Sequence, residues 1–418
     1  MIFTIAISLL ILTLAWKRPA IALAVLLQTN LIRSFAEIDF KNLCFHCVNE
    51  SNIILGFIIP ILSFILIFVK FTFIDAKFDF KLDVFDGFFI LTFIILSTGT
   101  IYAPNFLEAA DYTLRFLFIG GSYYFIIKFL LSNKTNELIL VKRFFYTSMF
   151  LAFVLGIVAL LIINYSGQYV ERITLPGVHP IPFSQLIGLA LLVSFVVFYS
   201  NGKILNIENK NILRLNNILF IFFTILLFAT NTRGVLFSAI IAILIFLALN
   251  IKKVKKTNLY IYGTILIVLI VIIVINIDVE VLFSRLLRST TDKSVIDRIT
   301  AYNDSINLFF NHFLGVGTNG FKYNSVLPYP HNLILENLAQ YGVLGLLLNV
   351  YFLLMILYMF LVTIKFRKKD MLIVLFFSLF CFFTIETMFS FTIWMHKGMY
   401  LSLGLFAAHF HIIKNKNR

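Results

Sequence analysis

Arginine and histidine side chains gather in connections between long apolar runs, and these residue types could do chemistry there. Arg172 and His179 lie in the connection 171–180, and Arg233 lies in the short turn 230–234. A guanidinium group presents a planar fork that binds phosphate or carboxylate at two points. Histidine gains and loses protons near neutral pH. These residues therefore indicate an anionic ligand and a proton-transfer step.

A third connection, 278–331, is the longest hydrophilic stretch and carries Arg285, Arg288 and Arg298. From 298 to 313, apolar residues recur among polar ones, which predicts an amphipathic helix on the membrane surface. The glycine-rich segment 315–321 follows. No strand precedes it, so it is not a nucleotide-binding fingerprint, and we expect a tight turn with close backbone approach.

The end of this connection places polar residues at the start of the next apolar run. His331 comes first, Asn332 could cap the following helix, and Glu336 lies one to two turns further on. His331 is our candidate for catalysis, and an acid buried in an apolar run needs a partner.

Each of these residues also has a structural interpretation. Asn332 could serve only as a cap, and a single histidine such as His179 is more often structural. Arg233 has long apolar runs on both sides, so its charge could simply reach the lipid headgroups. We favour the functional interpretation because a charge at the membrane border is costly without a purpose.

Composition decides the fold class. Of the 418 residues, 61% are hydrophobic and 13% are charged, against about 25% charged in soluble domains. Many apolar runs approach the length of about 20 residues that spans a bilayer, and backbone groups in lipid must pair within such a segment. The chain 1–418 is therefore predicted to be one all-α polytopic membrane domain of about 12–13 helices. The expected spans are 2–16, 19–33, 52–73, 84–101, 111–131, 143–165, 181–200, 214–230, 233–251, 258–277, 332–364, 371–391 and 398–413.

Basic residues predict the orientation. The net charge of +14 comes mostly from lysines in alternate short loops. Such loops face the cytoplasm, so nucleic acid is not the expected partner and the C-terminus is cytoplasmic. The remaining basic residues lie in the opposite set of loops, are mostly arginines, and run against this trend. They are Arg33, Lys41, Arg115, Arg172, Arg233, Arg285, Arg288, Lys293, Arg298, Lys322 and Lys397.

The cysteines suggest no metal site. Cys381 lies within an expected span and is expected to pack in the core. Cys44 and Cys47 have only His46 as a further ligand nearby, whereas zinc takes about four ligands. A local disulfide or two free thiols is the better interpretation.

Several of these features together resemble the O-antigen ligase/polymerase superfamily of bacterial surface polysaccharide assembly. They are Arg298 with the apolar stretch after it, the sequence Gly-Val-Gly-Thr-Asn-Gly-Phe at 315–321, His331-Asn332, and Gly-Val-Leu-Gly at 342–345. Arg172 and the Arg233-Gly234 turn occur where that family has its other outer arginines. The resemblance covers the whole chain, including the large outer loop between two late spans.

The resemblance implies glycosyl transfer on the extracytoplasmic (periplasmic) side of a bacterial cytoplasmic (inner) membrane. The donor would be an oligosaccharide on undecaprenyl diphosphate, with no metal or other cofactor. Membrane lipid and a chain-length regulator protein are further candidate partners. A polymerase would transfer the glycan to another lipid-linked repeat unit, and a ligase to a lipid A-core sugar.

A mechanism follows from these residues. Breaking the sugar–diphosphate bond develops negative charge, which Arg172, Arg233 and Arg298 are expected to stabilise as catalytic groups, with Arg285 and Arg288 binding substrate. His331 is the expected general base. Asn332, Glu336 and His179 are expected to bind substrate. We favour a polymerase because the outer loop is compact and the segment 331–345 looks like the polymerase branch.

A transporter or flippase of lipid-linked sugars is the alternative from another class. It would also need arginines for a diphosphate. It should, however, show charges near the middle of the membrane and repeated halves. The arginines here collect in the loops of one side, and the sequence shows no repeat.

Overall fold

The computed structural model describes residues 2–29, 31–32, 38–39, 44–45, 58–74, 82–132, 137–166, 173–175, 178–250 and 293–416. In this part of the chain, turns and loops join helices, and two strands of two residues each, β1 (Ile38–Asp39) and β2 (Cys44–Phe45), pair in antiparallel register. The predicted all-α membrane fold is confirmed. Cys381 is a free thiol, whereas Cys47 lies outside the described residues.

Seven of the described helices are long and apolar enough to cross a membrane, and three shorter apolar helices accompany them. The predicted span 84–101 coincides with α6 (Val84–Ile101). The predicted span 19–33 contains only a nine-residue helix, α2 (Pro19–Leu27), and 258–277 lies outside the described residues. The described residues therefore hold fewer helices of crossing length than the predicted total.

The chain groups into two compact units, each assembled from separate stretches of sequence. The first unit comprises residues 1–63, 138–289 and 367–382. Its described helices are α1 (Ile2–Lys17), α2, α9 (Glu137–Ser166, from 138 on), α10 (Pro180–Tyr199), η4 (Lys203–Leu205), α11 (Lys210–Ala229), α12 (Arg233–Asn250) and most of α17 (Leu372–Glu386). Within it α10 is largely buried and packs against α11 and α12.

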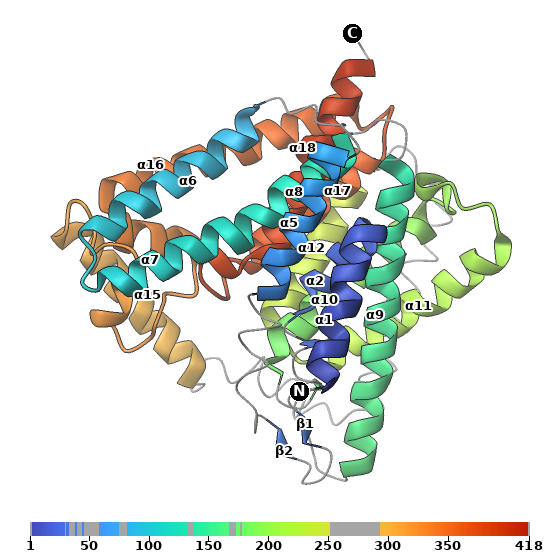
Figure 1. The fold of residues 1–418 in the computed structure, drawn as a ribbon, viewed down its shortest axis with the longest axis horizontal. Coiled ribbons are helices and arrows are strands. Elements are labelled where there is room, and N and C mark those ends of the chain that lie inside the picture. Colours follow the sequence, from blue (N-terminus) through green and yellow to red (C-terminus); the bar gives the residue numbers. More distant parts are fainter. Residues whose placement is uncertain are drawn as a thin grey trace. The chain divides into compact units, whose positions relative to one another are not determined.

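The second unit comprises residues 64–137, 290–366 and 383–418. It holds most of α5 (Ile59–Val69), then η2 (Lys70–Ile74), α6, α7 (Phe106–Arg115), η3 (Phe116–Gly121), α8 (Ser122–Ser132), α15 (Lys293–Asn311), η6 (Phe321–Tyr323), α16 (Leu333–Phe366), η7 (Ile393–Met395) and α18 (Lys397–Lys416). Helix α8 packs along α18, and α6 along α16 (Figure 1).

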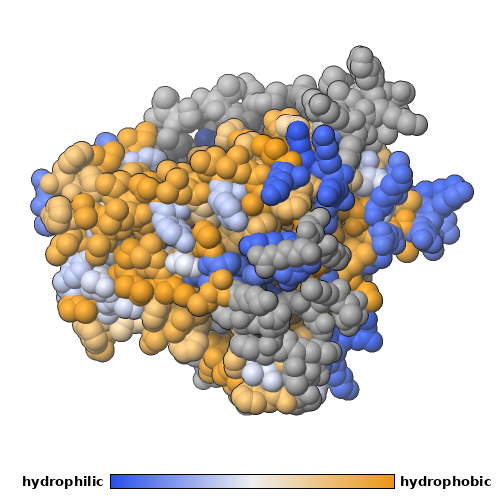
Figure 2. Space-filling view, turned by 90° about the horizontal axis from the view of Figure 1, so that it is seen from above, coloured by the Kyte–Doolittle hydropathy of each residue, from blue (hydrophilic) through white to orange (hydrophobic). Residues whose placement is uncertain are grey.

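Many large apolar side chains stay exposed on these helices, for example Leu353 and Leu361 of α16, at 54% and 55%. Apolar residues cover most of the coloured surface in Figure 2. A soluble protein rarely exposes contiguous apolar area of this kind, whereas a helix that contacts lipid normally exposes apolar side chains to it.

Several observed helices begin or end elsewhere than the predicted spans, for example at 111–131 and 371–391. The predicted span 111–131 starts earlier, because Asn105 caps α7 by accepting a hydrogen bond from the backbone N–H of Glu108. The predicted span 371–391 ends as a helix at Glu386.

A buried ionic cluster lies in the second unit among residues from connections that the lysine pattern assigns to the cytoplasmic side. Lys128 Nζ lies 2.9 Å from Asp83 Oδ2 and 2.5 Å from Asp86 Oδ2, and Tyr124 donates to Asp86 at 2.8 Å. Lys128 therefore does more than orient a loop, because it neutralises acids that would be costly to bury alone.

Candidate functional site

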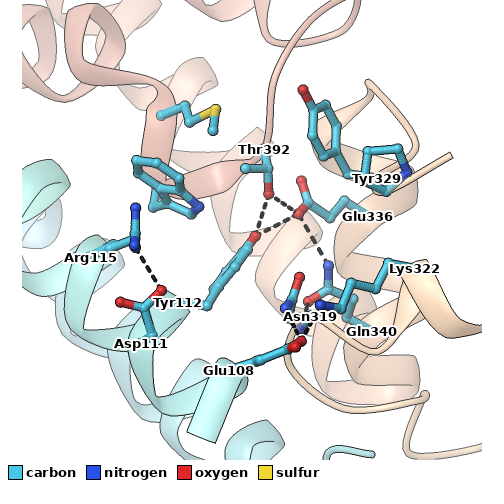
Figure 3. A pocket seen from close by; sticks show the side chains of 13 residues that line it. Glu108, Asp111, Tyr112, Arg115, Asn319, Lys322, Tyr329, Glu336, Gln340 and Thr392 are labelled. Atoms are coloured by element: carbon cyan, nitrogen blue, oxygen red, sulfur yellow. Dashed lines mark hydrogen bonds and ion pairs between the residues drawn. The ribbon is translucent and has the colours of Figure 1, made fainter. Parts of the chain in front are cut away.

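A cavity of about 290 Å³ lies in the second unit, where three polar segments meet (Figure 3). These segments are α7, the stretch 319–340 and the loop 392–395. Each of them contains or borders a basic residue that the lysine pattern predicts to lie outside the cytoplasm. The lining consists of Glu108, Asp111, Tyr112, Arg115, Asn319, Lys322, Pro328, Tyr329, Glu336, Gln340, Thr392, Trp394 and Met395.

The glycine turn and a break in α16 position one wall of this cavity. Gly342 has φ 54° and ψ −125°, so the helix is interrupted there. In an unbroken helix, residues 343 and 344 would donate to the carbonyls of 339 and 340. Instead, Val316 N donates to Ala339 O at 3.0 Å and Gly317 N donates to Gln340 O at 2.9 Å. The turn thus satisfies the carbonyls that the break leaves open.

The break folds the first part of α16 back on the second. Asn349 Nδ2 donates to Ile334 O at 3.0 Å, and Asn337 Nδ2 donates to Asn349 Oδ1 at 2.8 Å. In a straight helix, residues 334 and 349 would be about 22 Å apart. The predicted single span 332–364 is therefore wrong in its first part. Residues 333–341 form a short returning helix, which directs Glu336 and Gln340 into the cavity wall.

Glu336 lies at the centre of a buried polar network, with only 1% of its surface exposed. Its Oε1 accepts hydrogen bonds from Tyr112 at 2.6 Å and from Gln340 at 3.1 Å, and also one from the Thr392 hydroxyl (Figure 3). Its Oε2 is buried with no hydrogen-bond partner. One carboxylate oxygen is thus fully engaged and the other is unused.

Both basic side chains of the cavity are paired with acids of α7. Arg115 Nε lies 2.7 Å from Asp111 Oδ2, and its guanidinium carbon lies 5.2 Å from the Trp394 ring centroid. Lys322 forms an ion pair with Glu108, which raises the pKa of Lys322, and Tyr323 donates to the same carboxylate at 2.8 Å. The lining therefore holds one more acid than it has bases.

Tyr329 lines this cavity and lies against His331, and the charge of Arg298 acts on it. Burial raises the pKa of Tyr329. The carboxylate of Glu336 raises it further, and the nearby Arg298 lowers it. The Tyr329 and His331 rings lie 4.5 Å apart between centroids. Tyr329 therefore links the predicted catalytic residues to the cavity, although Arg298 and His331 are not among its lining residues.

His331 differs from the other histidine close to this region. The backbone at His331 has φ 58°, an uncommon conformation outside glycine that often marks a functional position. His396, by contrast, is buried, and burial lowers its pKa to about 3. A group with so low a pKa accepts a proton poorly at neutral pH, so His396 does not replace His331 as the candidate base.

Asn332 has a clear structural role. Its Oδ1 accepts a hydrogen bond from Leu335 N at 3.1 Å and so caps α16, as the sequence indicated. We expect Asn332→Ala to lower the free energy of unfolding by about 1 kcal/mol and Asn332→Asp to keep the cap. Thermal unfolding of the two variants in detergent measures this. Equal melting temperatures for Asn332→Ala and the wild type would contradict the capping role.

The first unit contains the two remaining predicted site residues that the structure describes. His179 is the N-cap of α10, with Nδ1 accepting from Ile181 N at 3.4 Å. Arg233 is the first residue of α12. Ile173 N donates to Ala229 O at 3.0 Å, so the two connections predicted to carry outer arginines meet within this unit. Arg172, Arg285 and Arg288 lie outside the described residues.

The predicted surface helix within the long connection is present as α15, which begins at Lys293. It buries Ala301 and Ser305 and exposes Ile299, Phe310 and other apolar side chains. Its exposed apolar residues are compatible with the predicted contact with lipid.

Sequence reasoning missed most of the cavity lining. The missed residues are Glu108, Asp111, Tyr112, Gln340, Thr392 and Trp394, together with the roles of Arg115 and Lys322. One signal was available, since three charged residues and a tyrosine occur within the ten residues of α7. Among the described residues, no group of three or more histidine, cysteine or acidic side chains could hold a metal ion.

Comparison with family models gives a match over part of the chain. Residues 218–350 match the family model described as O-antigen ligase. This match confirms the resemblance that the motifs indicated, and it covers Arg233, Arg298, His331 and Glu336. The comparisons with curated proteins and with solved structures found no match.

Proposed function

We propose, from the match of residues 218–350 to the O-antigen ligase family, that this chain transfers a glycan from undecaprenyl diphosphate to an acceptor sugar outside the cytoplasm. The observation that carries the proposal is the grouping of Arg298, Tyr329, His331 and Glu336 beside one cavity. A cation, a base and a polar pocket are the parts such a transfer requires.

The chemistry is a direct displacement. The acceptor hydroxyl attacks the anomeric carbon and loses its proton to His331. The bond from that carbon to the diphosphate oxygen breaks, and its electron pair leaves with undecaprenyl diphosphate. Arg298 stabilises the charge that develops on this leaving group. A single displacement inverts the anomeric centre.

We favour a polymerase, whose acceptor is another lipid-linked repeat unit. The compact outer loop and the segment 331–345 support this choice. The second candidate is a ligase with the same chemistry and a lipid A-core acceptor, which the description of the matching family favours. A strain deleted for the gene separates the two. Loss of a polymerase leaves single repeat units on the lipid A-core, whereas loss of a ligase leaves long chains on undecaprenyl diphosphate.

Arg298→Lys tests the role of the guanidinium fork, because lysine keeps the charge and loses the two-point geometry. Loss of one preorganised donor at developing charge typically costs about 2.7–4 kcal/mol. With the charge retained, we expect the rate of glycan transfer to fall about 10-fold to 100-fold. The rate is measured as release of undecaprenyl diphosphate at saturating substrate.

The matched control is Arg214→Lys, the same exchange at an exposed arginine of α11 outside the cavity. We expect this variant to change the rate of diphosphate release much less than Arg298→Lys does. A wild-type rate for Arg298→Lys at wild-type protein level would remove Arg298 from the proposed diphosphate contact.

A further inference from the structure

We propose that the cavity around Glu336 is the binding site for the acceptor sugar, with Glu336 Oε2 accepting a hydrogen bond from a sugar hydroxyl or amide N–H. This inference rests on the proposed function, because the acceptor sugar is one of the two substrates of the proposed transfer reaction. It excludes the diphosphate of the donor from the same cavity.

The charges of the lining argue against an anion. Arg115 and Lys322 are each paired with an acid, so neither cation is left to neutralise a phosphate. Glu336 adds an acid with no basic partner among the lining residues. A diphosphate would find no positive charge here that is not already paired with an acid, whereas a neutral or amino sugar needs none.

The volume and the side-chain types suit a sugar. The cavity of about 290 Å³ is at the small end of the range of about 300–1,000 Å³ for small-molecule sites. It therefore takes a single sugar unit more readily than a whole oligosaccharide. Trp394 and Tyr329 supply aromatic rings, and Asn319 and Gln340 supply amides, which can contact the apolar and polar parts of a sugar.

The carboxylate of Glu336 provides the specific contact. Tyr112, Thr392 and Gln340 all donate to Oε1 and fix the orientation of the group. Oε2 has no partner, and a buried acceptor left unpaired costs roughly 1–3 kcal/mol. A donor on the ligand would remove this cost, so the site is incomplete until a hydroxyl or N–H occupies it.

The position of the cavity suits an acceptor. Tyr329 lines the cavity, and its ring centroid lies 4.5 Å from that of His331, the proposed base, with the two rings tilted by 55°. A sugar held by Glu336 would therefore lie in a cavity whose wall includes Tyr329, the ring neighbour of His331. Arg298, which lies near Tyr329 but does not line the cavity, is left for the donor diphosphate.

Tryptophan fluorescence tests binding directly. The chain has two tryptophans, Trp16 and Trp394, and only Trp394 lines the cavity. The full-length Trp16→Phe variant in detergent therefore carries a single reporter. It is titrated with the oligosaccharide released by mild acid from the lipid-linked repeat unit of the same strain, and then with inorganic pyrophosphate.

We expect a saturable fluorescence change with the oligosaccharide and none with pyrophosphate. Adding Glu336→Gln should raise the Kd at least 10-fold, because the amide oxygen can still serve the three donors while an NH₂ replaces the free acceptor. Adding Glu208→Gln, an exposed change on the first unit, should leave the Kd unchanged. Competition by pyrophosphate, or an unchanged Kd in Glu336→Gln, would overturn the assignment.

Kinetics separate this inference from the proposed function. With donor and acceptor varied independently, we expect Glu336→Gln and Trp394→Leu to raise the KM for acceptor at least 10-fold and to leave the KM for donor unchanged. An unchanged donor KM also shows that the variants are folded. A wild-type enzyme with no transfer at all would defeat the proposed function. If the two variants stayed active and the KM for donor rose in place of the KM for acceptor, only the assignment of the cavity to the acceptor would be wrong.

Discussion

His331→Gly is expected to lower the rate of glycan transfer by about 100-fold or more while leaving the protein folded. General-base catalysis typically contributes about 10²–10⁴-fold, and the variant removes the imidazole. Glycine accepts the φ of 58° at this position without strain. The free energy of unfolding should therefore change little. Transfer is measured under saturating donor and acceptor, with thermal unfolding measured on the same preparation.

Two controls distinguish a base from a structural residue. His312→Ala removes an exposed imidazole from the same connection and should not change the rate. Added imidazole should restore part of the activity of His331→Gly, because the variant leaves space where the ring lay. If rate and melting temperature fell together, and imidazole had no effect, His331 would have a structural role only.

Gly342→Ala is expected to disrupt the second unit, with a loss of about 2–4 kcal/mol in the free energy of unfolding. A Cβ at this position would lie 2.1 Å from Phe313 O and 2.6 Å from Gly315 N. Both are backbone atoms that cannot move aside without breaking the contacts of the glycine turn. The φ and ψ values there are also outside the regions open to alanine.

The measurements for Gly342→Ala are melting temperature in detergent and transfer rate. Activity should fall with stability, because Glu336 and Gln340 depend on the break for their position. Leu346→Ala is the matched control, since Leu346 lies in the same helix and is 43% exposed. Wild-type stability and activity in Gly342→Ala would show that α16 does not need its break.

The sequence predicted most helices because lipid imposes a strong and local constraint. A run of apolar residues must pair its own backbone groups, so the limits of α6 and the start of α10 followed from composition. Asn332 as a cap followed from its place before an apolar run. The glycine-rich turn at 315–321 was predicted from glycine content alone, and its close backbone approach is confirmed.

The break at Gly342 could not be predicted from the apolar composition of the sequence. The run from 333 to 366 is apolar on both sides of the glycine, and hydropathy does not report backbone angles. The break depends on the N–H groups of Val316 and Gly317, which donate to the carbonyls that the break leaves without a helical partner. Only when turn and helix meet does the interruption cost little.

The cavity was missed for a related reason. Glu108 and Lys322 are separated by 214 positions, and Tyr112 and Thr392 by 280. Neither pairing leaves a local pattern. Arg115 was recognised as an outer arginine but not as the partner of Asp111, four residues away, although such spacing brings side chains together on a helix. The excess of arginine indicated on which side of the membrane a ligand binds, but it did not indicate which arginines are paired with acidic side chains.

Glycan transfer from a lipid diphosphate to a sugar acceptor can be measured with the purified full-length protein in liposomes that contain undecaprenyl-diphosphate-linked repeat units. We expect a ladder of longer lipid-linked glycans, with one undecaprenyl diphosphate released for each new linkage. Movement of the repeat units across the bilayer with no lengthening and no release of diphosphate would show that the chain is not a glycosyltransferase and would favour a transporter.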